Sequence, residues 1–180
     1  MRRVLATVAL LVGLAGCQSA ASPGPATPAL GVDGRGSMVR VVDGDTIVVR
    51  LAGREERVRL IGIDTPESVK PGSPVECFGK EASGHLASLL PEGTVVRLEG
   101  DVEQRDRYGR LLAYVYRDAD GLFVNAVMAR DGFAEPLTVP PNVAHTAELA
   151  TAARSARESG RGLWTACPAP GAPPTRAPPG

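Results

Sequence analysis

Two groups of charged residues in this 180-residue chain have side chains suited to phosphate chemistry. The first group runs from Asp45 to Glu67 and includes Arg59 and Asp64. The second is the segment Arg105–Arg110, with the sequence RDRYGR. Carboxylate oxygens are the ligands that a hard cation prefers, and a cation together with arginines can bind a phosphate group. These residues therefore indicate a cation-assisted site for a phosphate ester.

Arg59 is the most informative residue of the first group because it lies in an apolar stretch. Val58 and Leu60 flank it, and side chains alternate between the two faces of a strand. Burying a guanidinium there is costly unless a negative group meets it. Asp64 lies just past the end of this strand, and Asp45 begins the neighbouring one, so both can supply that negative group.

Several of these residues also have simpler interpretations. Asp43, with the glycine that follows it, is typical of a hairpin turn and receives no chemical role. Asp64 could be the N-cap of a helix with Glu67 as its capping-box partner. Arg107 and Arg110 could lie on a solvated loop face, with Tyr108 as a packing residue. None of these interpretations explains why an apolar strand carries Arg59 beside acidic residues, so we favour one combined site.

The elements that must position the site follow from periodicity and chain breakers. We expect three meandering strands, a helix, two more strands and two more helices. The strands are expected at 38–42, 46–51, 56–63, 94–100 and 111–117, and the helices at 78–90, 122–130 and 145–159. Three meandering strands cannot bury both faces alone, so we expect a small α+β barrel with helices packed against it.

Three segments carry a resemblance to a known family, namely VVDGDTIVV, RVRLIGIDTPE and RDRYGRLLAYVY. Together with the end of the last helix at Gly162-Leu163-Trp164, they resemble the staphylococcal nuclease (thermonuclease) family over Met38–Trp164. The resemblance implies a five-stranded OB-fold β-barrel with three helices. This α+β fold agrees with the order of elements expected from the residues.

The resemblance also implies an activity and a cofactor. Members are calcium-dependent endonucleases that hydrolyse phosphodiester bonds of DNA and RNA and leave 3′-phosphate ends. By this resemblance Asp45, Asp64 and the backbone carbonyl of Thr65 would bind Ca²⁺.

The remaining site residues also take their roles from the resemblance. Glu67 would orient or deprotonate the attacking water. Arg59 and Arg110 would bind the phosphate and stabilise the five-coordinate transition state. Arg107 and Tyr108 match positions that contact the neighbouring phosphate.

Two departures from the family pattern bear on substrate binding. A well-known member stacks a base on tyrosines in the loop between its last two helices, whereas loop 135–142 here (EPLTVPPN) has no aromatic residue. The 20 Lys and Arg are balanced by 20 Asp and Glu, so the chain has no global basic field. We expect weak substrate binding by a monomer, with single-stranded nucleic acid preferred.

The first sixteen residues predict a lipoprotein signal peptide. Arg2 and Arg3 precede a short apolar run that ends in Leu-Ala-Gly before Cys17. This arrangement resembles the bacterial lipobox, so Cys17 is the predicted lipidation site. The lipid would anchor the exported protein to the outside of the cytoplasmic membrane or to the cell envelope. An ordinary signal peptide and a buried N-terminal helix are the alternatives.

Composition divides the rest of the chain into three parts. Residues 17–36 are rich in Ala, Ser, Pro and Gly and predict a flexible linker after the lipidated cysteine. Residues 37–167 are expected to fold, and by the resemblance they would be the nuclease-like domain. Residues 168–180 predict a Pro-rich disordered tail.

Two cysteines remain after Cys17. An even pair in an exported domain predicts a disulfide between Cys77 and Cys167, and two unpaired buried thiols are the alternative. His85 and His145 are too few for a zinc site and are expected on helix surfaces or in the core.

Three functions compete. An active nuclease is favoured because Arg59, Glu67 and Arg110 are all present, whereas a silent module would tolerate their loss. The second candidate is a catalytically silent OB-fold lipoprotein that binds nucleic acid or protein. The third is a surface lipoprotein that only anchors or scaffolds in the envelope.

Overall fold

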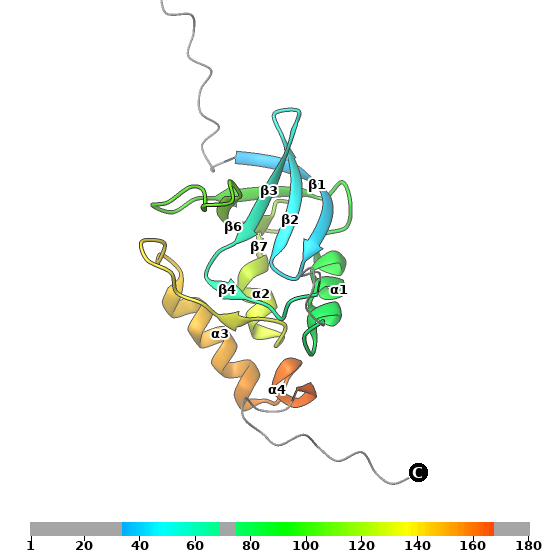
Figure 1. Ribbon diagram of the computed structural model, residues 1–180, viewed down its shortest axis with the longest axis vertical. Helices are drawn as coiled ribbons and strands as arrows, with labels where there is room; N and C mark the ends of the chain where they lie inside the picture. Colours follow the sequence, from blue (N-terminus) through cyan, green and yellow to red (C-terminus); the bar gives the residue numbers. More distant parts are fainter. Residues whose placement is uncertain (1–33, 69–74, 168–180) are drawn as a thin grey trace, which may run out of the picture.

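A closed β-barrel forms the centre of the computed structural model, which describes residues 34–68 and 75–167 (Figure 1). Five strands follow one another around it in the order β3, β2, β1, β5 and β6, and a parallel pairing of β3 with β6 closes the barrel. This arrangement confirms the predicted five-stranded barrel. The strands are β1 (Gly34–Asp43), β2 (Thr46–Leu51), β3 (Arg54–Leu60), β5 (Val95–Glu99) and β6 (Leu111–Arg117).

Three very short strands accompany the barrel. β7 (Leu122–Phe123) pairs with the end of β6. β4 (Ile63–Asp64) pairs with β8 (Glu135–Pro136) in a separate two-stranded ribbon. Gly62, with a φ of 82°, turns the chain between β3 and β4 in a conformation that glycine adopts readily.

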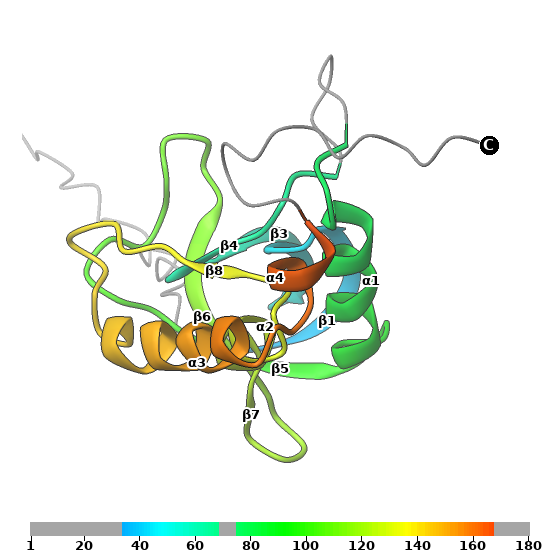
Figure 2. The same ribbon diagram turned by 90° about the horizontal axis from the view of Figure 1, so that it is seen from below.

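The helices lie toward the lower end of the barrel in Figure 1, and the view from below shows α1 on one side and α3 on another (Figure 2). They are α1 (Gly79–Leu89), α2 (Val124–Arg130), α3 (Thr146–Glu158) and the single turn α4 (Leu163–Ala166). The first three confirm the predicted helices, and α4 is an addition. Within residues 34–68 and 75–167, no helix is long and apolar enough to cross a membrane.

The core fills the barrel and the space between the barrel and the helices. On β3, Val58 and Leu60 are fully buried, whereas Arg57, the residue before Val58, is exposed. This pattern is expected because successive side chains of a strand point to opposite faces. Asn125 at the start of α2 is also fully buried. Its amide donates to the carbonyl of Ile61 at 2.8 Å, and its oxygen accepts from the N–H of Val115 at 2.9 Å. This side chain therefore ties α2 to the end of β3 and to β6.

The structure corrects several predicted boundaries. β1 begins at Gly34, so residues 34–36 belong to the barrel rather than to the linker, because their backbone pairs with β5 whatever their side chains. Leu122–Phe123 is a strand rather than the first turn of a helix, since it pairs with β6. β3 ends at Leu60 because the chain turns at Gly62. The predicted signal peptide, Cys17 and the Pro-rich tail lie outside the described residues.

Candidate active site

Asp45 lies in the turn between β1 and β2, where the chain packs tightly. Gly44 makes the turn possible, because a Cβ there would lie 2.7 Å from Oγ1 of Thr65 and 2.9 Å from the Cβ of Ala82. Asp45 is 7% exposed. Its Oδ1 accepts from the hydroxyl of Thr46 at 2.9 Å, and its Oδ2 accepts from the N–H and the hydroxyl of Thr65 at 3.2 Å each. The buried carboxylate is therefore held in one orientation.

Arg59 meets the acidic residues that the sequence analysis anticipated. Its side chain is 14% exposed and forms ion pairs with Asp45 and with Asp64, the latter at 2.7 Å. It also donates to the carbonyl of Ile63 at 3.2 Å. Burial lowers the pKa of Arg59, and this effect outweighs the attraction of Asp64. One guanidinium thus bridges the two carboxylates that were predicted to bind the cation.

Asp64 reaches this position through the β4–β8 ribbon. It pairs with Glu135 across the ribbon, and the N–H of Leu137 donates to the carbonyl of Gly62 at 3.0 Å. The side chain of Asp64 is 58% exposed, in contrast to that of Asp45. The pair therefore consists of one buried carboxylate and one open to solvent.

Arg110 comes from the loop before β6. Strand β6 runs parallel to β3 with Val58 opposite Leu111, which places Arg110 level with Arg57 in the middle of β3. Asp106 holds it twice, accepting from the backbone N–H at 3.0 Å and from Nε at 2.7 Å. Burial acts to raise the pKa of Asp106, but its bonds to Arg110 outweigh burial and lower it. Nη1 of Arg110 lies 3.5 Å from the hydroxyl of Thr46 on β2.

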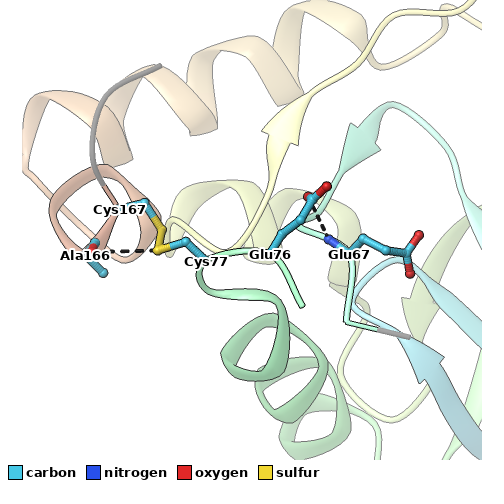
Figure 3. Close-up of a disulfide and its surroundings, with 5 residues drawn as sticks. All are labelled: Glu67, Glu76, Cys77, Ala166 and Cys167. Atoms are coloured by element: carbon cyan, nitrogen blue, oxygen red, sulfur yellow. Dashed lines mark hydrogen bonds between the residues drawn. A yellow bond between two sulfur atoms is a disulfide. The ribbon is translucent and has the colours of Figure 1, made fainter. Parts of the chain in front are cut away.

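Glu67 follows the DTP turn and is held through its backbone. Its N–H donates to Oε2 of Glu76 at 3.0 Å, and its carbonyl accepts from the N–H of Glu76 at 2.9 Å. The side chain of Glu67 extends away from Glu76 (Figure 3). Its side chain lines the cleft described next.

A polar cleft of about 380 Å³ collects these side chains. All six residues predicted to be catalytic or to bind the metal line it: Asp45, Arg59, Asp64, Thr65, Glu67 and Arg110. Three further charged residues that the sequence analysis did not assign also line it, namely Asp43, Arg57 and Glu76. Cations and carboxylates thus share one cavity that is large enough for a phosphate group.

Asp43 is a site residue that sequence reasoning missed. It is 7% exposed, and its Oδ1 accepts from the hydroxyls of Ser68 at 2.6 Å and Ser83 at 3.1 Å. Burial acts to raise the pKa of Asp43, but its hydrogen bonds with Glu67, Ser68 and Ser83 outweigh burial and lower the pKa. The serines reach Asp43 from distant positions in the chain, so no local pattern in the sequence indicated this cluster.

Arg107 and Tyr108 lie beside the polar cleft rather than in it. They line a second cleft of about 510 Å³, which shares Arg59 and Arg110 with the first. The guanidinium of Arg107 donates to the hydroxyl of Tyr108 at 2.6 Å, and Tyr108 is 68% exposed. The second cleft therefore adjoins the polar cleft, because Arg59 and Arg110 line both.

Loop 135–142 forms the opposite wall of this second cleft. Leu137, Val139 and Asn142 line it together with Leu112 of β6. Asn142 exchanges two hydrogen bonds with the backbone of Glu103, at 2.8 and 2.9 Å, and so holds the loop in place. The wall that could meet a base is therefore aliphatic.

The oxygen atoms at the site suit a hard cation that needs few ligands from the protein. In the described part of the chain, no cluster of three or more His, Cys, Asp and Glu residues could hold a metal ion. Asp45 and Asp64 nevertheless lie close enough for one guanidinium to bridge them, and Thr65 bonds directly to Asp45. Two carboxylates and a nearby backbone suit Ca²⁺, which takes carboxylates, carbonyls and waters in a flexible shell.

Cys77 and Cys167 form a disulfide, with their Cα atoms 5.9 Å apart (Figure 3). The bond connects Cys77, two residues before the start of α1, to Cys167, the residue directly after α4.

Comparison with known proteins agrees with this geometry. The sequence profile described as "Staphylococcal nuclease homologue" matches residues 57–166. The chain is 44% identical to a thermonuclease of Staphylococcus intermedius over 125 residues, covering 69% of this chain and 73% of that protein. It is 39% identical to a thermonuclease of Staphylococcus hyicus over 128 residues, covering 71% and 74%.

A third relative is named an endonuclease. The endonuclease YncB of Bacillus subtilis is 37% identical over 128 residues, which cover 70% of this chain and 59% of that protein. The profile match, the barrel and the shared identity over most of the domain lead to one conclusion: the chain belongs to the staphylococcal nuclease family.

Proposed function

We propose that the protein is a calcium-dependent endonuclease that hydrolyses phosphodiester bonds of DNA and RNA and leaves 3′-phosphate ends. The observation that carries the proposal is the cleft that brings Arg59, Arg110 and Glu67 together beside Asp45 and Asp64. The thermonuclease and endonuclease relatives support a hydrolase acting on nucleic acid.

The two arginines supply the electrostatic part of the reaction. Arg59 and Arg110 line the same cavity, Arg59 from β3 and Arg110 from the loop before β6. A phosphate between them gains two multidentate donors, whose bonds to oxygen strengthen as negative charge builds up in the five-coordinate transition state. Asp106 keeps Arg110 oriented, so little rearrangement is needed when the substrate binds.

Glu67 supplies the proton chemistry. Its carboxylate orients a water or takes a proton from it as the water oxygen forms a bond to phosphorus. The bond from phosphorus to the 5′ oxygen breaks, and this oxygen leaves as a hydroxyl after taking up a proton. The products are a 3′-phosphate end and a 5′-hydroxyl end, and the atoms balance with one water consumed.

Asp45, Asp64 and the backbone carbonyl of Thr65 are the residues that would hold Ca²⁺. When bound there, the ion would supply positive charge beside the phosphate and offset the carboxylates. The buried Asp45 is already oriented by three hydrogen bonds, so part of the ordering that a metal site requires is present in the fold.

The second cleft would receive the part of the substrate next to the scissile phosphate. Arg107 would contact the neighbouring phosphate, and the exposed ring of Tyr108 lies beside it. The aliphatic side chains of Leu137 and Val139 offer no ring for stacking. We expect binding of single-stranded substrate by a monomer, with little preference among bases.

The silent OB-fold module remains the alternative function, and one assay separates the two. The full chain is incubated with single-stranded DNA or RNA in Ca²⁺ and then with a calcium chelator. Cleavage that stops on chelation, with 3′-phosphate ends on the products, supports the nuclease. Binding without cleavage under both conditions supports the silent module.

We also propose that Cys17 carries a lipid that anchors the exported protein to the cell envelope. The motif of small residues before this cysteine supports the proposal. Labelled fatty acid should appear on the wild-type protein in membrane fractions. Cys17→Ser should be unlabelled and released, and membrane-bound Cys17→Ser would contradict the anchor.

A further inference from the structure

The disulfide lies next to a residue that holds the proposed catalytic glutamate. Cys77 directly follows Glu76, and Cys167 lies 90 positions later at the end of α4. In Figure 3, Glu67, Glu76 and the disulfide follow one another across the view, and the sulfur of Cys77 lies 3.8 Å from the carbonyl oxygen of Ala166. The cross-link is therefore close to the proposed active site in space.

Glu76 binds both backbone polar groups of Glu67. Its carboxylate accepts from the N–H of Glu67 at 3.0 Å, and its own N–H donates to the carbonyl of Glu67 at 2.9 Å. Two bonds to one residue fix the orientation of its backbone and hence the direction in which its side chain leaves the chain. Glu76 is itself exposed, so water competes for these two hydrogen bonds unless other contacts hold the residues around Glu76 in place.

The start of α1 packs against the same residue. A Cβ at Gly79 would lie 2.7 Å from the carbonyl oxygen of Glu67, so the helix approaches this peptide as closely as a glycine permits. The backbone of Glu67 is therefore enclosed between Glu76 and Gly79. Cys77 and Phe78 are the two residues that connect Glu76 to Gly79 along the chain.

The joining residues adopt an unfavourable backbone conformation. Phe78 has a φ of 72°, in the left-handed region that residues with a side chain avoid. Such a conformation persists only where the surroundings hold it. On one side the ring of Phe78 stacks on Phe133 at 5.1 Å, and on the other side the disulfide holds Cys77.

The far end of the disulfide is anchored to the fold. Leu163 of α4 is buried, and its N–H donates to the carbonyl of Gly132 at 2.9 Å. The guanidinium of Arg157 on α3 lies 4.1 Å from the ring centre of Trp164. The cross-link therefore attaches the segment of Glu76 to a fixed point between α2 and α3.

We propose that the Cys77–Cys167 disulfide and Glu76 together position Glu67, so that the rate of the chemical step depends on this bond being intact. The inference rests on the proposed function, in which Glu67 acts on the attacking water. Glu76 is a positioning residue, because it acts through the backbone of Glu67. A dithiol would open the bond by giving one electron and one proton to each sulfur, and it would become a disulfide itself. Loss of the bond would leave the phosphate contacts of Arg59 and Arg110 in place.

Three variants of the full chain test the proposal with Glu92→Ala as the matched control. Glu92 is an exposed glutamate in the turn after α1. Glu76→Ala removes the acceptor for the N–H of Glu67, Glu76→Gln keeps an oxygen there, and Cys77→Ser/Cys167→Ser removes the disulfide. The kcat and KM of each are measured with single-stranded DNA in Ca²⁺ at a temperature at which circular dichroism shows every variant folded.

We expect Glu76→Ala and the double serine variant to lower kcat, by up to about 100-fold, with KM within about twofold of wild type. Glu76→Gln and Glu92→Ala should retain kcat. Reduction by a dithiol should lower the kcat of wild type, reoxidation should restore it, and the double serine variant should not respond. An unchanged kcat in both Glu76→Ala and reduced wild type, even with a lower melting temperature, would overturn the proposal. Glu76→Ala keeps the disulfide, so it decides the matter if the double variant does not fold.

Amide hydrogen exchange at Glu67 tests the same link without activity. The exchange rate of the Glu67 N–H should rise in Glu76→Ala and in the reduced protein and stay at the wild-type value in Glu92→Ala. An unchanged rate would show that Glu67 is held by other contacts. An inactive wild type with this exchange pattern would contradict the nuclease but keep the positioning link, so the two failures are distinguishable.

Discussion

Arg59 donates to Oδ1 of Asp64 at 2.7 Å while its side chain also pairs with Asp45. The residue proposed to bind substrate phosphate is thus held by the two carboxylates proposed to bind Ca²⁺. A cation at the carboxylates would compete with Arg59 for their oxygens and leave its donors available to a phosphate. Metal binding and substrate binding should therefore reinforce each other.

Ca²⁺ should support cleavage better than Mg²⁺. Two carboxylates and a backbone oxygen leave several positions to water in a flexible shell, whereas Mg²⁺ demands near-ideal octahedral geometry. Asp64→Asn should raise the Ca²⁺ concentration needed for half-maximal cleavage, and Asp120→Asn on the β6–β7 hairpin is the control. Cleavage rates across a titration of each ion provide the measurement. Full activity in Mg²⁺, or in the absence of any metal, would contradict the site.

Arg59→Ala and Arg110→Ala should each lower kcat by about 100- to 1000-fold. The reason is that each removes a donor whose bonds strengthen in the transition state. Arg50→Ala is the matched control, because Arg50 is an exposed arginine on β2 that pairs with Glu55. Single-turnover cleavage measures the chemical step directly. Near-wild-type rates in either variant would remove that arginine from the mechanism.

Val139→Tyr should strengthen substrate binding. A ring stacked on a base contributes about 1–3 kcal/mol, and Val139 is 56% exposed in the wall of the second cleft. KM should fall by about 5- to 150-fold with kcat unchanged, while Val95→Tyr on the exposed face of β5 should have no effect. Titration with a nucleoside bisphosphate at several salt concentrations measures both the binding affinity and its dependence on salt. Tight binding by wild type with a steep salt slope would mean that another surface binds the substrate.

His145 should make stability depend on pH. Burial acts to lower the pKa of His145, but hydrogen bonds to Glu99 and Glu148, each 3.1 Å long, outweigh it and raise the pKa above its ordinary value of 6.5. The folded state therefore favours the protonated ring. This contribution is fully present below the unfolded pKa and is lost as the pH rises through the folded pKa.

Urea unfolding at about pH 6 and about pH 8 measures the effect of His145. The free-energy difference between wild type and His145→Gln should be larger at the lower pH, by about 1 kcal/mol or less for such partly exposed pairs. Glu99→Gln should weaken the pH dependence. A difference that grows as the pH rises would contradict the raised pKa.

Removing the Cys77–Cys167 disulfide should lower the free energy of unfolding. The bond closes a loop of 90 residues, for which the chain-entropy model gives up to about 4–5 kcal/mol. Denaturant unfolding of the oxidised protein, the reduced protein and Cys77→Ser/Cys167→Ser provides the comparison. Mass spectrometry that finds both thiols free in the native protein would rule the cross-link out.

The sequence by itself determined the barrel and the identity of the main site residues. Alternating apolar positions such as Val58 and Leu60, together with turn glycines, indicate strands whatever their partners, because the period of a strand is a local property. The motifs around Asp45, Asp64 and Arg110 identified the side chains that now line one cleft.

Only the tertiary structure decided which groups hold these residues. The bonds of Asp43 to Ser68 and Ser83 span 25 and 40 positions, and the second cleft is walled by loops that are distant in the chain. No sequence motif gave Glu76 a role, yet it binds both backbone groups of Glu67. Burial and contact depend on how the whole chain packs, so the spacing of residues cannot reveal a partner that only the closed barrel and the anchored helices bring within reach.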